Sequence, residues 1–311
     1  METIEKPFSK MPVSTRFWLL WLLLFIATAF ASLISSLVIM NMTGIKSLEG
    51  LSILSDLSNP DVVFVLKMTQ LISAVGAFII PAHIFATLSS TNYRGYLNLT
   101  AANRNNQYVL AIVCMISALP LVNWLATINS SLHLPDALQS VEAWMRKSEK
   151  EAEQVTEAFL RMSGFKDLGL NIFIIGFIAA FAEELFFRGA LQKVLKEWTK
   201  SEHAAVWISS ALFSALHMQF LGFVPRLLLG VMLGYMKEWS GSLWVPILAH
   251  FVNNAGAVLL SFLIQKAIIS DTTEDLGASG NDWIFVVLSG ILLSALLFYF
   301  FKNRLKPQTT L

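Results

Sequence analysis

The amino-acid sequence predicts an all-α, polytopic membrane protein with about eight transmembrane helices and one amphipathic helix. Its residues are 55% hydrophobic and only 14% charged, whereas a soluble domain carries roughly 25% charged residues. The apolar runs are long and do not alternate, as the strands of a membrane barrel would. Because every backbone polar group must be satisfied inside a bilayer, helices are the remaining solution. We expect a single transmembrane helical domain over residues 1–311.

Each predicted span is a long apolar segment. A helix rises about 1.5 Å per residue, so about 20 residues cross a hydrocarbon core of roughly 30 Å. The first segment continues to Met42, well beyond the roughly 7–15 residues of a signal-peptide core, and is predicted to be retained. The fifth and sixth segments are short, and we expect them to be tilted, partial or shielded. The segments are about 17–40, 62–88, 108–128, 168–191, 204–220, 224–236, 243–264 and 283–301.

The segment 134–162, between the third and fourth spans, has a different character. Apolar residues such as Leu138, Val141 and Met145 recur at intervals of three and four residues, which is the pattern of an amphipathic helix. Glu142 lies early in the segment, where the helix dipole favours an acid. The pattern predicts a helix that lies on the membrane surface or caps the bundle.

Loop charges predict that both termini are cytoplasmic, because cytoplasmic loops carry an excess of Lys and Arg. An even number of spans places both ends on one side, and both ends are basic. The opposite loops are neutral or acidic, with Asp271, Glu274 and Asp275 before the last span. The exception is the segment 134–162, whose basic residues are balanced by several glutamates; they are Arg146, Lys147, Lys150 and Arg161. The basic residues on the side of the termini are Lys6, Lys10, Arg16, Arg94, Arg104, Lys193, Lys196, Lys200, Lys237, Lys302, Arg304 and Lys306.

The composition also argues against several classes of partner and site. The net charge is +1 and no basic block is present, so we expect no nucleic-acid partner. Cys114 is the single cysteine; it excludes intrachain disulfides and is expected to be a small core residue. His83, two residues after Pro81 in the second span, is expected to be a hydrogen-bonded core residue.

Polar side chains interrupt three of the later apolar segments. Charged groups at membrane depth cost about a few kcal/mol each, so a sequence keeps them there when they are paired, face a wet cavity or take part in chemistry. We therefore predict that the three segments converge on one intramembrane active site. The residues are Glu183, Glu184 and Arg188, then Phe213 and His217, then His250 and Asn254.

The two adjacent glutamates have different surroundings. Glu184 and Arg188 are four residues apart, so they share a helix face and can pair. Glu183 is rotated by about 100° on a helix of 3.6 residues per turn, and its neighbour along the axis is Phe187. Glu183 is therefore the freer carboxylate and the better general base. The alternative is a polar helix end that carries an ordinary surface ion pair.

A peptide hydrolase needs a base that deprotonates water and donors that hold the tetrahedral oxyanion. Glu183 with His217 can supply the base. His250 and Asn254 lie one helical turn apart, so they can supply two side-chain N–H donors aimed at one point. These residues thus match what hydrolysis of a peptide bond requires.

The motifs EExxxR, FxxxH and HxxxN, in this order on successive apolar helices, resemble the CPBP family. That family comprises intramembrane glutamic proteases related to type II CAAX prenyl endopeptidases and to bacteriocin-processing or self-immunity proteins. The resemblance covers a catalytic core of about residues 168–260. It implies an eight-helix bundle in which Glu183 and His217 activate water and His250 and Asn254 form the oxyanion site. It also implies supporting roles for Glu184, Arg188 and Phe213.

Two alternatives stay open beside this hypothesis. A glutamate with two histidines is a known zinc ligand set, although the sequence has no HExxH motif and Arg188 is an unusual neighbour for a cation. The second alternative is a non-enzymatic immunity or transport protein that uses the same polar pocket for binding. Under the main hypothesis the partners are membrane lipids and a membrane-associated or lipidated peptide or protein, and no cofactor is expected.

Overall fold

The computed structural model describes all residues except 1–5, 45–47, 103, 274–275 and 305–311. Within the described part the chain forms helices and no strands, which confirms the predicted all-α class. The helices are α1 (Val13–Thr43), α2 (Pro60–Ala74), α3 (Ile80–Ser89), α4 (Tyr93–Tyr96), α5 (Asn106–Ser131), α6 (Gln139–Leu160), α7 (Phe165–Asn171), α8 (Ala179–Glu184), α9 (Gln192–Thr199), α10 (Glu202–Leu216), α11 (Phe223–Ser240), α12 (Trp244–Gln265) and α13 (Trp283–Lys302). Short 3₁₀ turns lie at Leu48–Ser55, Asp136–Leu138, Asp271–Thr273 and Gly280–Asp282.

Two of the long helical rods are interrupted by π-helical turns. One rod joins α2 to α3 through η2 (Val75–Ile79). The other runs from α7 to α9 and contains η4 (Ile172–Ile178) and η5 (Leu185–Leu191) on either side of α8. A π turn shifts backbone carbonyls out of the regular hydrogen-bond ladder, and such turns are frequent at functional sites. The paired glutamates end α8, immediately before the second of these turns.

Six helical rods in the described part of the chain are long and apolar enough to cross a membrane. They are Val13–Thr43, Pro60–Ser89, Asn106–Ser131, Phe165–Thr199, Trp244–Gln265 and Trp283–Lys302. The two short predicted spans also form helices, α10 and α11, but α10 has only 15 residues and α11 carries Arg226, Lys237 and Glu238. Both pack against each other and against the long rods, and both also expose large apolar side chains, such as Trp207 on α10 and Leu228 on α11.

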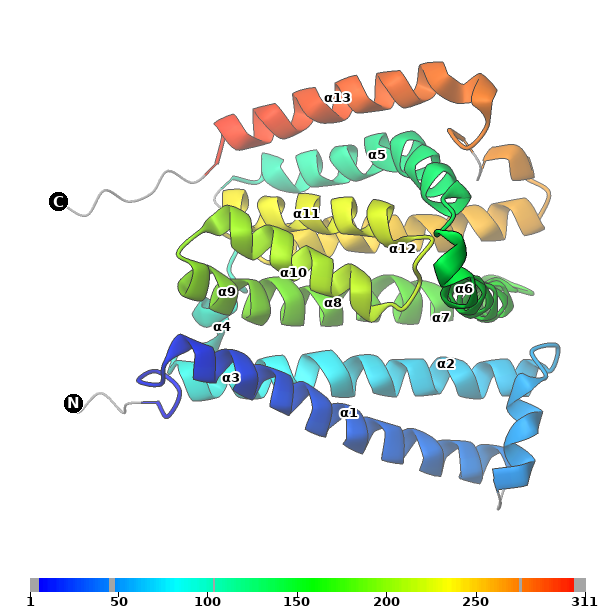
Figure 1. Cartoon of the computed structure of the whole chain (residues 1–311), viewed down its shortest axis with the longest axis horizontal. Helices are drawn as coiled ribbons and strands as arrows, with labels where there is room; N and C mark the ends of the chain where they lie inside the picture. The colour runs from blue at the N-terminus through cyan, green and yellow to red at the C-terminus, as the bar shows by residue number, and fades with distance from the viewer. Residues whose placement is uncertain (1–5, 45–47, 103, 274–275, 305–311) are drawn as a thin grey trace.

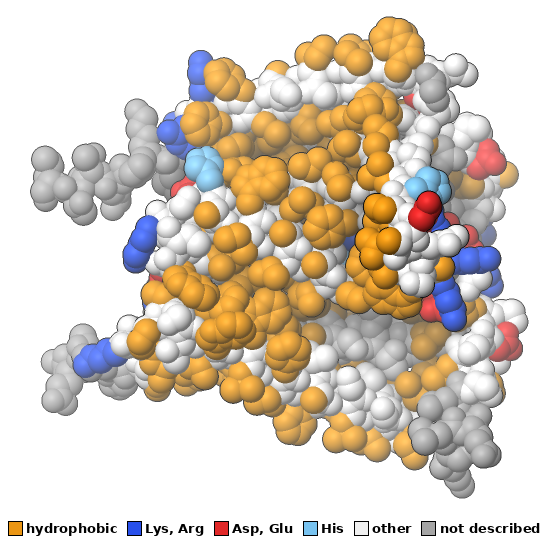
Figure 2. All heavy atoms as spheres, in the orientation of Figure 1, with side chains coloured by type: hydrophobic (Ala, Val, Ile, Leu, Met, Phe, Trp, Pro, Cys, Tyr) orange, Lys and Arg blue, Asp and Glu red, His pale blue; other side chains and the backbone are white. Residues whose placement is uncertain are grey.

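Side-chain chemistry on the surface fits a membrane environment. Figure 2 shows hydrophobic side chains across the middle of the visible face, while Lys, Arg, Asp and Glu gather at its two ends. Large apolar side chains such as Phe25, Leu288 and Phe298 are more than half exposed. A contiguous exposed apolar belt is a surface for lipid contact, and α1 begins at the same end of the bundle where α13 ends (Figure 1).

The amphipathic segment forms α6, which is seen end-on in Figure 1 and lies across the end of the bundle opposite the termini. Glu142 ties its start to the end of α5: it accepts from Arg146 Nε at 2.8 Å and from the backbone N–H of Leu134 at 2.8 Å. These bonds, that from Arg146 first, lower the pKa of Glu142 to about 2. Further along, Glu149 accepts from the backbone N–H of Leu221 at 3.1 Å. The prediction of an amphipathic helix is confirmed, and α6 holds the loop between α10 and α11.

One core prediction is confirmed and one is wrong. Cys114 is fully buried. His83, by contrast, is exposed, and its ring meets the edge of Tyr93 with centroids 5.0 Å apart. The buried face of α3 is formed by Pro81, Ala82, Phe85, Ala86 and Ser89. Residue 83 lies on the opposite face of that helix.

Candidate active site

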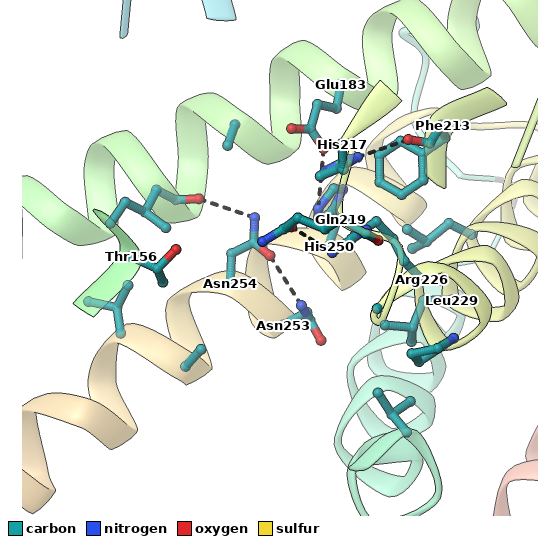
Figure 3. Close-up of a pocket in the computed structure, with 18 of the residues that line it drawn as sticks. Thr156, Glu183, Phe213, His217, Gln219, Arg226, Leu229, His250, Asn253 and Asn254 are labelled. Atoms are coloured by element: carbon teal, nitrogen blue, oxygen red, sulfur yellow. Dashed lines mark hydrogen bonds and ion pairs between the residues drawn. The ribbon is translucent and has the colours of Figure 1, made fainter. Parts of the chain in front are cut away.

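The three polar segments meet at one cavity of about 470 Å³. Glu183 comes from the end of α8, His217 from the C-cap of α10, and His250 with Asn254 from α12. All four side chains line the cavity together with Phe213, as Figure 3 shows. The predicted convergence of these segments is therefore present in the structure.

Glu184 and Arg188 lie behind the cavity wall, and both side chains are fully buried. Arg188 Nη1 is 3.0 Å from Glu184 Oε1, so the predicted i, i+4 pair forms. The same oxygen is 2.9 Å from Nδ1 of His250, 66 residues further along the chain. A buried carboxylate is tolerated when it is paired and hydrogen-bonded. Here Arg188 provides the opposite charge and the imidazole of His250 provides a hydrogen bond.

The guanidinium of Arg188 is fitted closely between helices. Its Nη2 donates to the backbone carbonyl of Gly230 in α11 at 3.1 Å, and its Cζ lies 4.5 Å from the ring centre of Phe213. A Cβ at residue 230 would stand 3.1 Å from Arg188 Nη2. Glycine is therefore the residue that lets the α11 backbone approach the arginine.

Glu183 is the carboxylate that reaches the cavity. Its side chain is 17% exposed, and its Oε2 lies 3.7 Å from Nε2 of His250. Because a carboxylate only accepts, the proton of the contact between His250 and Glu184 is on Nδ1. That bond orients the imidazole and turns Nε2 toward Glu183.

His217 is accessible from the cavity and is held by its own helix. Its Nδ1 is 2.8 Å from the carbonyl oxygen of Phe213, and the two rings meet edge to face with centroids 4.9 Å apart. A carbonyl oxygen only accepts, so Nδ1 carries a proton and Nε2 is free to accept one. No nitrogen of His217 lies within 4.0 Å of the Glu183 carboxylate. The histidine that does lie within this distance is His250.

Asn254 is anchored to a π turn. Its Nδ2 donates to the carbonyl of Ile175, in η4, at 3.1 Å, and its Oδ1 accepts from Asn253 at 3.1 Å. Both bonds are drawn in Figure 3. One N–H of the Asn254 amide is thus engaged, and the second remains for another acceptor.

The second π turn, η5, is supported in a similar way. The hydroxyl of Ser209 donates to the carbonyl of Phe187 at 3.0 Å, and the same carbonyl accepts from the backbone N–H of Gln192, five residues later. These turns were not predicted, because they depend on side chains of other helices. They place Glu183 and Glu184 between two irregular segments of one rod.

Several residues of the cavity wall were also missed by the sequence reasoning. Thr156 and Phe159 come from α6, Gln219 from the loop after α10, and Arg226 from the first turn of α11. For Arg226 a signal was present, because an arginine inside a predicted span is costly and needs a reason. Gln219 and Thr156 carry no comparable signal.

The arrangement of His and acidic side chains bears on the alternative of a zinc site. Among the described residues, no group of three or more His, Cys, Asp or Glu side chains is arranged to hold a metal ion. Glu184, which would be a natural ligand, already contacts Arg188 and His250.

Comparisons with known proteins identify the segment that carries these residues. Residues 166–256 match the Rce1-like family, described as type II CAAX prenyl endopeptidase Rce1-like. The uncharacterized protein YpbD of Bacillus subtilis (strain 168) is 37% identical over 89 residues, which are 27% of this chain and 42% of YpbD. The match thus spans less than half of that relative. No solved structure shows a significant match. Residues 166–256 therefore form a segment that matches the Rce1-like family model, and the resemblance predicted from the three motifs is confirmed over that segment.

Proposed function

We propose that the chain is an intramembrane endopeptidase that hydrolyses a membrane-associated or lipidated peptide or protein. One observation carries the proposal: Glu183 opens onto a cavity shared with His217, His250 and Asn254, while Glu184 behind it is neutralised by Arg188. The family of residues 166–256 supports the same reaction class.

In the proposed reaction, Glu183 and His217 activate a water molecule between them. The two side chains line one cavity but do not bond directly, which leaves space for that water. Nε2 of His217 accepts one hydrogen bond from it, and Glu183 takes the proton as the oxygen attacks the scissile carbonyl. Arg188 and His250 keep Glu184 engaged, so the neighbouring carboxylate does not compete for the proton.

The carbonyl oxygen becomes an oxyanion when the water oxygen bonds to the carbon. We assign its donors to the free N–H of Asn254 and to Nε2–H of His250; in this proposal the ring carries that proton throughout the cycle, in addition to the one on Nδ1. Collapse of the intermediate breaks the C–N bond, and protonated Glu183 returns its proton to the leaving nitrogen. Water and peptide bond thus yield a carboxylic acid and an amine, and the site returns to its starting state.

This mechanism needs no metal ion or organic cofactor. The charge that develops on the substrate is met by hydrogen-bond donors, and the proton moves through a carboxylate. The buried pair of Glu184 and Arg188 would act by orienting the first glutamate and the His250 ring. Phe213 would act by packing, since its ring lies against both Arg188 and His217.

We further propose that both termini are cytoplasmic, because the basic ends and alternate loops favour that side. The expected result is that a reporter active only in the cytoplasm gives a signal when it is fused to either end. Fusions after residue 56, in the first loop, serve as the control and are expected to be silent. Opposite responses of the two ends would contradict an even number of membrane passages.

Removing the proposed oxyanion donor is the direct test of the mechanism. Asn254→Ala is expected to lower kcat by about 10²–10³ with little change in KM, because such a donor acts mainly in the transition state. The substrate is found first, as a precursor that accumulates in membranes of cells carrying Glu183→Ala protein but is processed in cells carrying wild type. Turnover is then measured with purified protein.

His250→Ala and a metal assay separate the alternatives. If zinc supplied the chemistry, His250→Ala would remove stoichiometric metal and Asn254→Ala would leave kcat near normal. If the cavity only bound a ligand, protection or transport would survive Glu183→Gln, and no precursor would accumulate. A near-normal kcat for Asn254→Ala would refute the oxyanion assignment.

A further inference from the structure

Arg226 is a charged residue of the cavity that the proposed reaction does not use. It lies in the first turn of α11, and its side chain is half-buried. Among the described side chains that line the cavity, Glu183 is the only carboxylic acid and Arg226 is the only lysine or arginine. The cavity therefore holds one anion, at the proposed catalytic centre, and one cation on a separate wall (Figure 3).

The partners of Arg226 leave its charge uncompensated at short range. Its Nη2 donates to Oε1 of Gln219 at 2.7 Å, and its Nη1 donates to the backbone carbonyl of Gln219 at 3.3 Å. Both acceptors are neutral. Within the described residues no carboxylate oxygen lies within 4.0 Å of the guanidinium, although Glu149 and Glu183 attract it from further away. Burying a charge without a paired counter-charge is costly.

Three other arginines of the bundle are each paired with a carboxylate. Arg188 pairs with Glu184 at 3.0 Å, Arg146 with Glu142 at 2.8 Å, and Arg16 with Glu197 at 2.5 Å. Each of these arginines has a structural carboxylate within the protein. Arg226, which is the one that faces the proposed substrate cavity, does not.

The backbone around Arg226 adds positive potential and keeps the guanidinium in place. The N-cap of α11 is Gly222, which provides no capping side chain, so the N-terminal N–H groups and the helix dipole favour an anion there. A Cβ at residue 222 would stand 3.0 Å from Arg226 Nη2, so the guanidinium lies directly over the start of the helix. The loop before it is fixed from outside by Asn129, which donates to the carbonyl of Phe220 at 3.0 Å.

Resting on the proposed function, we propose that Arg226 and Gln219 form a subsite that binds a carboxylate of the peptide substrate. The guanidinium offers a planar fork that matches a carboxylate, and the amide nitrogen of Gln219 offers a further donor, because its oxygen already accepts from Arg226. The carboxylate belongs either to the free C-terminus of the peptide or to an acidic side chain. Bound at Arg226, it is held away from the like charge of Glu183, and the scissile bond is thereby placed toward Glu183 rather than toward α11.

The competing explanation is structural: Arg226 could simply hold the loop 217–222 through Gln219. The two explanations differ in whether the effect of Arg226 on affinity depends on the charge of the peptide. A loop brace lowers binding of every peptide by the same factor, whereas a carboxylate subsite changes the preference between peptides that differ only in that charge. The measured quantity is therefore a ratio of affinities within one protein variant.

The experiment uses three matched pools of apolar hexapeptides: one with free C-terminal carboxylates, one with C-terminal amides, and one with amides plus an internal glutamate. Binding to the full-length Glu183→Gln protein in lipid nanodiscs is measured by mass spectrometry of retained peptides. Because a carboxylate forms charge-assisted hydrogen bonds with Arg226, we expect one of the two carboxylate-bearing pools to bind with a Kd about tenfold or more below that of the pool with plain C-terminal amides. Adding Arg226→Gln is expected to reduce that ratio to about one, and Arg226→Lys to keep part of it.

Each outcome decides one question. Preference for the first pool identifies the C-terminus as the source, and preference for the third identifies an acidic side chain. Equal binding of all three pools to Glu183→Gln protein, or a ratio that survives Arg226→Gln, overturns the subsite. Arg104→Gln is the matched control, since Arg104 also bonds to a neutral amide, that of Asn303 at 2.6 Å, and is not part of the cavity wall. Cleavage of the pools by wild type is scored separately, so a protein that binds but does not cut contradicts the proposed function and not this subsite.

Discussion

Glu183→Gln protein is expected to lose turnover by about 10²–10⁴, which is the usual contribution of a general base. The amide keeps the size of the side chain but does not accept the proton of the attacking water. Because Glu183 is 17% exposed to the cavity and is not part of the buried pair, the free energy of unfolding should change by only about 0.5 kcal/mol. Turnover and thermal unfolding are measured on the same purified samples in lipid nanodiscs.

Glu153→Gln is the matched control for this change. Glu153 lies on α6 and is exposed, so its conversion makes the same chemical substitution outside the cavity. We expect turnover of the control to equal that of wild type. Residual activity of Glu183→Gln above one tenth of wild type would assign the base to another group, and an equally large loss of stability would show that Glu183 is structural.

Arg188→Ala is expected to have the largest effect on stability, of about 3–5 kcal/mol, because it leaves the Glu184 carboxylate buried without its cation. Turnover should fall in the same variant, since Glu184 orients the His250 ring through the 2.9 Å contact. The loss also removes the packing of the guanidinium on Phe213. Thermal or denaturant unfolding of purified protein measures the first effect, and precursor cleavage measures the second.

A double substitution distinguishes the charge from the packing. Glu184→Gln with Arg188→Met replaces a buried ion pair by neutral groups of similar size, which is often close to neutral in stability. We therefore expect the double variant to unfold at a higher temperature than Arg188→Ala protein, while its turnover stays low because His250 loses its charged partner. If the double variant were as unstable as Arg188→Ala, the buried charge would not be the cause.

Much of this fold could be predicted because the deciding signals are local in the chain. Apolar runs long enough to span a bilayer indicate helices wherever they occur, and the period of the segment 134–162 predicts α6. The pair of Glu184 and Arg188 follows from a spacing of four residues on one helix and forms at 3.0 Å. The candidate site could be located for the same reason, since polar groups at membrane depth stand out in an apolar sequence.

The pairing between elements was decided by the tertiary structure alone. The sequence associated His250 with Asn254, one turn away, but in the structure its Nδ1 contacts Glu184 and its Nε2 lies near Glu183. Asn254 in turn bonds to a carbonyl of a π turn on another rod. Neither contact follows from spacing along one helix, because both depend on how α8 and α12 cross.

The prediction for His83 was wrong for a related reason. In water, the apolar stripe of a helix marks its buried face. In a bilayer the lipid is as apolar as the protein core, so hydropathy along a helix does not say which face meets other helices. The sequence by itself therefore determined which segments are helices and which polar residues are candidates for the chemistry. The packing of those helices decided which face of α3 is buried, which histidine meets each glutamate, and that Arg226 faces the cavity.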